Sequence, residues 1–177
     1  MRRFLPALFA ICLALPAAAH DAQRVKLVLS VTIDAPAAKI WSVIGNFQDL
    51  SWDCAVAGTI GQGGNTPNVA TRSVTLKAGG VLPNEELERY EPKNFTYATF
   101  LPHVDVHVLP VTDYSSIIDI VPNTTGGSTV EWRSAFYRGY PNFGPPPELN
   151  EAAAIKAVTA MVKPALACLK TRFAGHG

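Results

Sequence analysis

The sequence predicts an α+β fold in which a curved antiparallel sheet of about seven strands wraps one long C-terminal helix. Two observations support this prediction. Between Val25 and Arg138, segments of alternating apolar and polar residues follow one another with short turn-rich connections, as in an antiparallel meander. After three prolines at 145–147, apolar residues instead recur every three or four positions up to Phe173, the spacing of one helical face. Such a helix needs a broad apolar surface, which the sheet can supply.

The chain begins with the features of a secretory signal peptide. Two arginines precede an apolar run over residues 4–15, and three small alanines end the segment at Ala19. The apolar run is too short for a permanent membrane span, and no later stretch suggests a membrane anchor. We therefore expect cleavage after Ala19 and an exported protein with a single domain over residues 20–177.

Loss of this segment changes the charge and the cysteine content. The full chain has 15 Lys+Arg and 14 Asp+Glu, a formal charge of +1; removing two arginines leaves 13 against 14, or −1. This balance does not indicate a nucleic-acid-binding surface. Cys12 is also lost. Cys54 and Cys168 remain in an oxidising compartment, where they can form a disulfide or stay as two buried thiols.

The mature chain opens with a strand and two short helices. Residues 25–33 alternate in polarity, which predicts a strand with one buried face. Asp34 or the Ala-Pro step after it begins a helix through residues 39–44, which Gly45 ends. Residues 47–53 are expected to form the second short helix.

The middle of the chain contains strand and turn signals. Strands begin at Val56, and the clearest cover residues 69–77, 81–90, 95–101, 114–121 and 129–138. Gly79 and Gly80 turn the chain between the first two of these ranges, so they form a hairpin. A turn there puts Val74 opposite Glu85 and makes Arg72 a diagonal neighbour of Glu85.

The C-terminal helix is expected to start after Asn150, whose side chain can cap the first turn. Its apolar face is formed by Ile155, Val158, Val162, Ala165, Leu166, Leu169 and Phe173. Pro164 lies inside the helix and cannot donate a backbone hydrogen bond, so we expect a bend there rather than a break. A bent sheet around such a helix can leave a cavity between them.

Residues 30–47, SVTIDAPAAKIWSVIGNF, resemble the opening of the START-like, Bet v 1-like helix-grip proteins. This SRPBCC superfamily includes the bacterial polyketide cyclase/dehydrase group. The order of the predicted elements agrees with it over nearly the whole mature chain. The resemblance implies a helix-grip fold but says little about function, because that fold hosts carriers, receptors and enzymes.

Residues 108–116, VLPVTDYSS, and residues 130–141, VEWRSAFYRGYP, continuing into PPPELN at 145–150, resemble a narrower group. These are the MxaD-like proteins, exported members of the superfamily associated with bacterial methanol oxidation. The resemblance implies a periplasmic accessory protein that assists methanol dehydrogenase in working with its cytochrome c acceptor. It implies no catalytic residue.

Alternation along the last two strands selects the side chains that face the helix. These are Tyr114, Ser116, Ile118, Ile120, Val130, Trp132, Ser134 and Phe136. Tyr114, Ser116, Trp132 and Phe136 can line a ligand pocket, which is typically apolar with a few polar groups, or they can simply fill the core.

Arg72 and Glu85 are the most informative charged pair. Each shares its strand face with leucine or valine residues, so both side chains can point inward. A guanidinium and a carboxylate in a cavity can hold a polar ligand group, and Glu85 is a weak candidate for a catalytic acid or base. The alternative is an ion pair at the sheet edge that reaches solvent and contributes little to stability.

His103, Asp105 and His107 alternate, so on a strand they would share one face, as metal ligands can. The valines between them are better core candidates, so we interpret the three residues as a solvated edge and expect no metal. The sequence has no nucleophile elbow, no Gly-rich phosphate loop and no pair of zinc motifs, and we expect no cofactor.

The connection between the last strand and the helix is rich in aromatic residues and prolines. Tyrosine and arginine are common anchors of protein interfaces, and a stiff loop loses little entropy on binding. We select Arg138, Tyr140 and Phe143 as candidate partner contacts. A rigid connector without a partner is the alternative.

Three functional hypotheses follow. The first is a non-enzymatic periplasmic accessory protein that assists an alcohol dehydrogenase with its cytochrome c acceptor. The second is a carrier or sensor of a small hydrophobic ligand. The third is a cyclase- or dehydratase-like enzyme that uses Glu85 as its acid or base.

Overall fold

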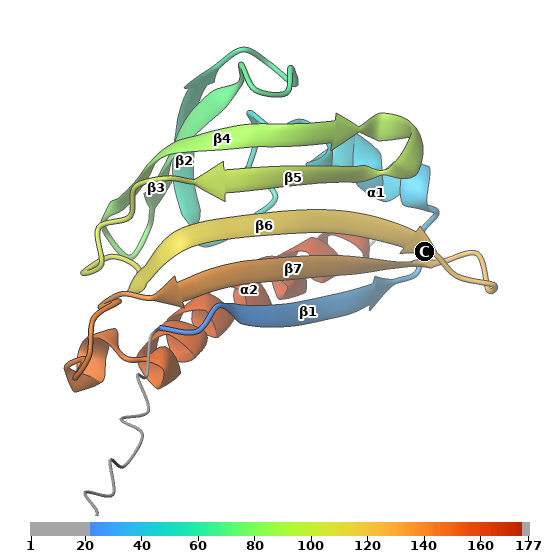
Figure 1. Cartoon of the computed structure of the whole chain (residues 1–177). Coiled ribbons are helices and arrows are strands. Elements are labelled where there is room, and N and C mark those ends of the chain that lie inside the picture. Colours follow the sequence, from blue (N-terminus) through green and yellow to red (C-terminus); the bar gives the residue numbers. More distant parts are fainter. Residues whose placement is uncertain (1–21, 175–177) are drawn as a thin grey trace, which may run out of the picture.

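The computed structural model describes residues 22–174, which form one seven-stranded antiparallel sheet and a long helix (Figure 1). The strands are β1 (Val25–Ile33), β2 (Val56–Gln62), β3 (Thr71–Leu76), β4 (Val81–Glu91), β5 (Thr96–Leu101), β6 (Val111–Pro122) and β7 (Ser128–Arg138). The helices are α1 (Ala37–Ile44) and α2 (Glu151–Phe173), with 3-10 turns η1 (Pro92–Asn94) and η2 (Pro147–Leu149). The predicted α+β class is confirmed. The predicted signal peptide lies outside the described residues.

The strands follow one another as a meander, and β1 returns to pair with the last strand. The order across the sheet is β1-β7-β6-β5-β4-β3-β2, and all neighbours are antiparallel. Alternation decides which face is buried: all eight residues of β6 and β7 that were predicted to face the helix are buried. In Figure 1, α2 lies behind the sheet and crosses β6, β7 and β1.

Bulges bend this sheet around the helix. Register shifts interrupt the β2–β3, β3–β4, β4–β5 and β6–β7 pairings. Two of the shifts coincide with residues of positive φ, Asn84 (51°) and Asp113 (48°). Asn and Asp are the non-glycine residues that adopt this conformation most readily, and a bulge increases the local bend and twist of a strand. The curvature of the sheet is therefore encoded at a few polar positions.

Helix α2 forms as its spacing predicts. Asn150 caps it, because its side chain accepts a hydrogen bond from the Ala153 backbone N–H at 2.9 Å. The helix continues through Pro164 without a break. Its buried residues are Ala154, Val158, Val162, Ala165, Leu166 and Leu169. Among the described residues α2 is the one helix long and apolar enough to cross a membrane by length and composition, but it packs along the sheet (Figure 1).

The second short helix predicted over residues 47–53 is wrong, because this segment forms consecutive turns. Its polar side chains cause the difference. Asn46, Asp49 and Asp53 each accept a hydrogen bond from the backbone N–H two residues further along the chain. Such side-chain turns compete with the backbone hydrogen bonds of a helix. We refer to residues 45–55 as the turn segment.

The predicted register of the β3–β4 hairpin is also wrong. Val74 pairs with Leu82 rather than with Glu85, and Arg72 lies directly opposite Glu85. The connection is longer than a two-residue turn, with the Leu76 N–H donating to the Gly80 carbonyl, and the bulge at Asn84 adds one residue to β4. Both effects bring Glu85 closer to Arg72 than the sequence indicates.

A disulfide between Cys54 and Cys168 joins the turn segment to α2. Their Cα atoms are 5.9 Å apart and the two residues are 114 positions apart in sequence. Closing a loop of this length stabilises the fold by about 5 kcal/mol in a chain-entropy model, because the unfolded chain loses freedom. The disulfide therefore fixes the turn segment against the helix.

Candidate functional site

A small pocket, the inner pocket, lies inside the fold between the sheet, the turn segment and α2. Its polar lining comes from Asp53, Arg72, Glu85, Tyr114 and Trp132. The remaining lining is apolar and comes from Leu50, Val56, Val74, Leu76, Leu82, Leu101 and Met161. Its volume is about 40 Å³. One water molecule needs roughly 10–15 Å³ and small-molecule sites usually span about 300–1,000 Å³, so the inner pocket holds only a few heavy atoms.

The structure brings together four of the six predicted cavity residues, namely Arg72, Glu85, Tyr114 and Trp132. Ser116 is buried elsewhere, where its hydroxyl exchanges a 2.9 Å hydrogen bond with Thr99. Phe136 packs beside the pocket, stacked on Tyr114 with ring centroids 6.2 Å apart. Some of the side chains that face the helix therefore fill the core instead of lining the pocket.

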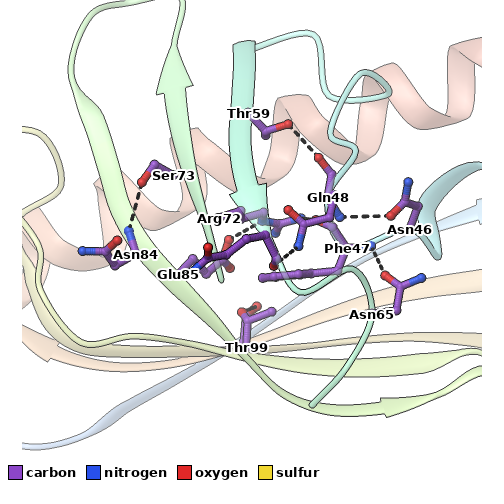
Figure 2. Close-up of polar contacts among 12 residues, drawn as sticks. Asn46, Phe47, Gln48, Thr59, Asn65, Arg72, Ser73, Asn84, Glu85 and Thr99 are labelled. Atoms are coloured by element: carbon purple, nitrogen blue, oxygen red, sulfur yellow. Dashed lines mark hydrogen bonds and ion pairs between the residues drawn. The ribbon is translucent and has the colours of Figure 1, made fainter. Parts of the chain in front are cut away.

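Arg72 and Glu85 form a buried ion pair at this pocket. The Arg72 Nε donates to the Glu85 Oε2 at 2.7 Å, and the two side chains are only 4% and 13% exposed. A second guanidinium nitrogen donates to the Phe47 carbonyl, and the Phe47 ring centroid lies 4.3 Å from the guanidinium carbon. Figure 2 shows Arg72 between Glu85 and the turn segment that carries Phe47. The alternative of a solvated pair at the sheet edge does not fit this burial.

The surroundings keep Arg72 charged. Burial alone lowers the pKa of Arg72, but the adjacent Glu85 carboxylate, with a contribution from Tyr97, outweighs burial and raises that pKa above its ordinary value. Burial also raises the pKa of Tyr97 to about 12, although Arg72 opposes this shift. The pocket therefore contains a permanent cation whose charge is compensated by Glu85.

Tyr114 and Trp132 form a second polar group in the lining of the pocket. The Trp132 Nε1 donates to the Tyr114 hydroxyl at 3.3 Å, and that hydroxyl exchanges a 3.0 Å hydrogen bond with Ser134. Burial raises the pKa of Tyr114, against the smaller effects of Ser134 and Trp132. Tyr114 is therefore a neutral group whose hydrogen bonds are directed within the protein.

Asp53 is a pocket residue that the sequence patterns did not identify. Its side chain is 6% exposed, and its Oδ1 accepts a 2.9 Å hydrogen bond from the Ala55 N–H. Burial raises the pKa of Asp53, and the Ala55 N–H, Lys77 and Arg72 offset only part of this shift. The available signal was its position beside Cys54, because the disulfide holds this segment against α2.

A larger apolar space of about 430 Å³, the outer groove, adjoins the inner pocket. Leu76, Leu82 and Met161 line both spaces, so they separate the two. The outer walls come from the first half of α2, the turn after β3 and the loop before β6, through residues that include Ala157, Ala78 and Val108. In size and apolar character the outer groove resembles small-molecule sites.

The loop beside this groove carries His103, Asp105 and His107. The three are exposed and lie in a loop, not on a strand, and the Asp105 carboxylate accepts a hydrogen bond from the His107 backbone N–H. Within residues 22–174, no group of three or more His, Cys, Asp and Glu side chains is positioned to hold a metal ion.

The segment after β7, residues 139–147, forms a rim at one end of the fold. The Arg138 guanidinium donates to the carbonyls of Tyr140 at 2.8 Å and Asn142 at 3.0 Å. The Tyr140 N–H donates to the Leu149 carbonyl at 3.2 Å. Phe143 is 81% exposed. Arg138 therefore braces the rim segment, and Phe143 is its exposed aromatic side chain.

Comparison with known proteins identifies a family. A family model described as polyketide cyclase/dehydrase and lipid transport matches residues 24–174. Among solved structures, the chain is similar to protein XoxI from Bacillus cereus, with 23% identity, a TM-score of 0.70 and coverage of 85% of this chain and 96% of that one. A search of curated proteins found no match.

Two further solved structures share the fold. A putative uncharacterized protein from Bacillus thuringiensis has 24% identity and a TM-score of 0.69, over 84% of this chain and 98% of that one. A protein from Nitrosospira multiformis has 22% identity and a TM-score of 0.66, over 85% and 97% of the two chains. Identities this low establish the fold alone. The family model over residues 24–174 confirms the predicted superfamily, while the closer likeness to MxaD-like proteins stays a prediction.

The buried carboxyl of Asp53 predicts a pH dependence of stability. Because its pKa is raised above the ordinary 3.8, the folded protein holds this proton more tightly than the unfolded chain. The protonated Asp53 carboxyl therefore adds to the free energy of unfolding. This contribution is complete below pH 3.8 and is lost over the interval between pH 3.8 and the raised pKa of the folded state. We expect the unfolding free energy of the natural protein to fall relative to Asp53→Asn over this interval, measured by urea unfolding at a series of pH values. The raised pKa of Asp53 would be contradicted if the unfolding free energy of the natural protein, minus that of Asp53→Asn, stays constant or grows with pH.

Proposed function

Because the chain belongs to the polyketide cyclase/dehydrase and lipid transport family, we propose that it acts by binding, as an exported accessory protein of alcohol oxidation. In this proposal the rim docks on a periplasmic alcohol dehydrogenase or its cytochrome c acceptor. The resemblance of residues 108–116, 130–141 and 145–150 to MxaD-like proteins suggests these partners. The observation that carries the proposal is the exposed Phe143 on a braced segment.

The rim has the properties of a protein-docking site. Phe143 exposes 81% of its surface, so its ring is available as an aromatic anchor for a partner. Arg138 holds the backbone just before Phe143 through the Tyr140 and Asn142 carbonyls, and three prolines follow at 145–147. A preorganised loop with an aromatic anchor binds with a small entropic cost.

The disulfide supports export. Structural disulfides persist in oxidising compartments such as the periplasm and are rare in the cytosol. Cys54 is exposed, so the reductants of a reducing compartment would have access to the Cys54–Cys168 bond. Together with the predicted signal peptide, this supports a periplasmic location.

The enzyme hypothesis has less support from the geometry. Glu85 would have to act as the acid or base, yet its carboxylate is engaged by the Arg72 guanidinium at 2.7 Å. The inner pocket of about 40 Å³ also leaves little room for a polycyclic substrate beside Glu85. We therefore retain binding as the proposed activity.

Docking through the rim is tested by electron transfer between a purified periplasmic alcohol dehydrogenase and its cytochrome c. Adding the mature protein should change the rate, and Phe143→Ala should raise the concentration needed for half of this effect by on the order of tenfold, as expected for an interface anchor. Ile60→Ala is the matched control, since Ile60 is 83% exposed but lies on β2, at the sheet edge opposite to β1. The proposal fails if the protein has no effect at any ratio, or if both variants act alike.

A second candidate function is a carrier or sensor of a small hydrophobic ligand. The specific observation is the outer groove of about 430 Å³, which adjoins the inner pocket through Leu76, Leu82 and Met161. Native mass spectrometry of the exported protein should then reveal a retained small molecule, which Met161→Trp displaces by filling the boundary between the two spaces. An unliganded mass for the natural protein in every preparation would count against this function.

A further inference from the structure

The inner pocket and the outer groove have different chemistry and meet at three side chains. Leu76 and Leu82 come from the β3–β4 hairpin and Met161 from α2, and all three line both spaces. Met161 is only partly buried and packs against the core. Methionine is unbranched and flexible, so it can change rotamer without loss of backbone structure. A chain that enters the groove can therefore reach the inner pocket past Met161.

Size assigns different parts of a ligand to the two spaces. The groove of about 430 Å³ is large enough for the apolar body of a small molecule, and the inner pocket of about 40 Å³ for only a small head group. The groove is lined by alanine, leucine, valine and methionine side chains together with Lys77, whose Nζ donates to the Cys54 carbonyl at 2.8 Å.

Charge then restricts the head group. Arg72 is compensated by Glu85, so the inner pocket presents no unpaired cation to an anionic head. The other ionisable groups that line it are Asp53 and Tyr114, and neither is basic. Burying an anion beside two carboxyl groups is unfavourable, and an ammonium head would lie against the Arg72 guanidinium. An uncharged head avoids both penalties.

The hydrogen-bonding groups add a requirement for a donor. Arg72 engages Oε2 of Glu85 and the Ala55 N–H engages Oδ1 of Asp53, so one oxygen of each carboxyl group has no hydrogen-bond partner within the described residues. The Tyr114 hydroxyl already contacts Ser134 and Trp132. Glu85 is the carboxylate paired with a cation, and an ionised carboxylate is the stronger acceptor. The smallest uncharged head group that can donate a hydrogen bond to Oε1 of Glu85 is a hydroxyl.

We propose that the two spaces form one site for a neutral amphiphile, with an apolar chain in the groove and a hydroxyl head at Glu85 Oε1. This inference rests on the carrier function and specifies its ligand class. Met161 separates the chain from the head. Lys77 lines the groove but not the inner pocket, and its Nζ is already engaged by the Cys54 carbonyl at 2.8 Å.

The test compares 1-decanol with decanoate, two probes with the same chain length, by isothermal titration calorimetry on the mature protein at pH 8. We expect decanol to bind at least about tenfold more tightly than decanoate. Glu85→Gln leaves the Arg72 charge uncompensated, so it should reverse this preference by improving decanoate binding. Met161→Trp should weaken binding of decanol, whereas Lys163→Trp, at an exposed position of the same helix, should not.

The outcomes separate this inference from the carrier function. Binding of decanol and decanoate with equal affinity, both weakened by Met161→Trp, would leave a carrier but overturn the hydroxyl specificity. Failure of both probes to bind, with no ligand retained in native mass spectrometry, would overturn both. If Glu85→Gln does not fold, the ratio of the two affinities for the natural protein decides, and a ratio near one rejects the proposal.

Discussion

The buried ion pair between Arg72 and Glu85 is the interaction on which the rest of the structure depends. It joins β3 to β4, and through the Phe47 carbonyl and ring it also holds the turn segment. Burying two charges is costly unless geometry and further hydrogen bonds compensate. The 2.7 Å contact, the Phe47 carbonyl and the aromatic face beside the guanidinium provide this compensation. Breaking the pair would therefore loosen β3, β4 and the turn segment together.

The disulfide holds the same turn segment at a second point. Cys54 is bonded to α2, and its neighbours Asp53 and Ala55 line the inner pocket and the outer groove, respectively. The ion pair therefore fixes the start of the segment against the sheet, and the disulfide fixes its end against the helix. Both spaces are therefore bordered by a segment without regular secondary structure. Binding sites are commonly formed by such loops on a rigid scaffold.

Periodicity was sufficient to predict the sheet, α2 and the inward faces of β6 and β7, because burial of one face imposes a period of two or of 3.6 residues. It failed where local side-chain chemistry overrides periodicity. The hydrogen bonds of Asn46, Asp49 and Asp53 replaced a predicted helix by turns. The bulge at Asn84 changed the partner of Glu85.

The site was predictable only in part for the same reason. Tyr114 and Trp132 follow from alternation along regular strands. Asp53 belongs to an irregular segment whose path depends on the Cys54–Cys168 bond, so no period reveals it. Pocket volume depends on how apolar side chains from distant elements meet, as Leu82 and Met161 do, and such packing is not visible in a linear pattern.

The most direct measurement is a double-mutant cycle on the free energy of unfolding, with Arg72→Met, Glu85→Leu and the double variant. Each single substitution should cost about 3–5 kcal/mol, because it leaves a buried charge without its partner. The double variant should cost clearly less than the sum of the two, since apolar side chains then replace the whole pair. Additive costs would mean that the two charges act independently, and they would contradict the central role of the ion pair in this fold.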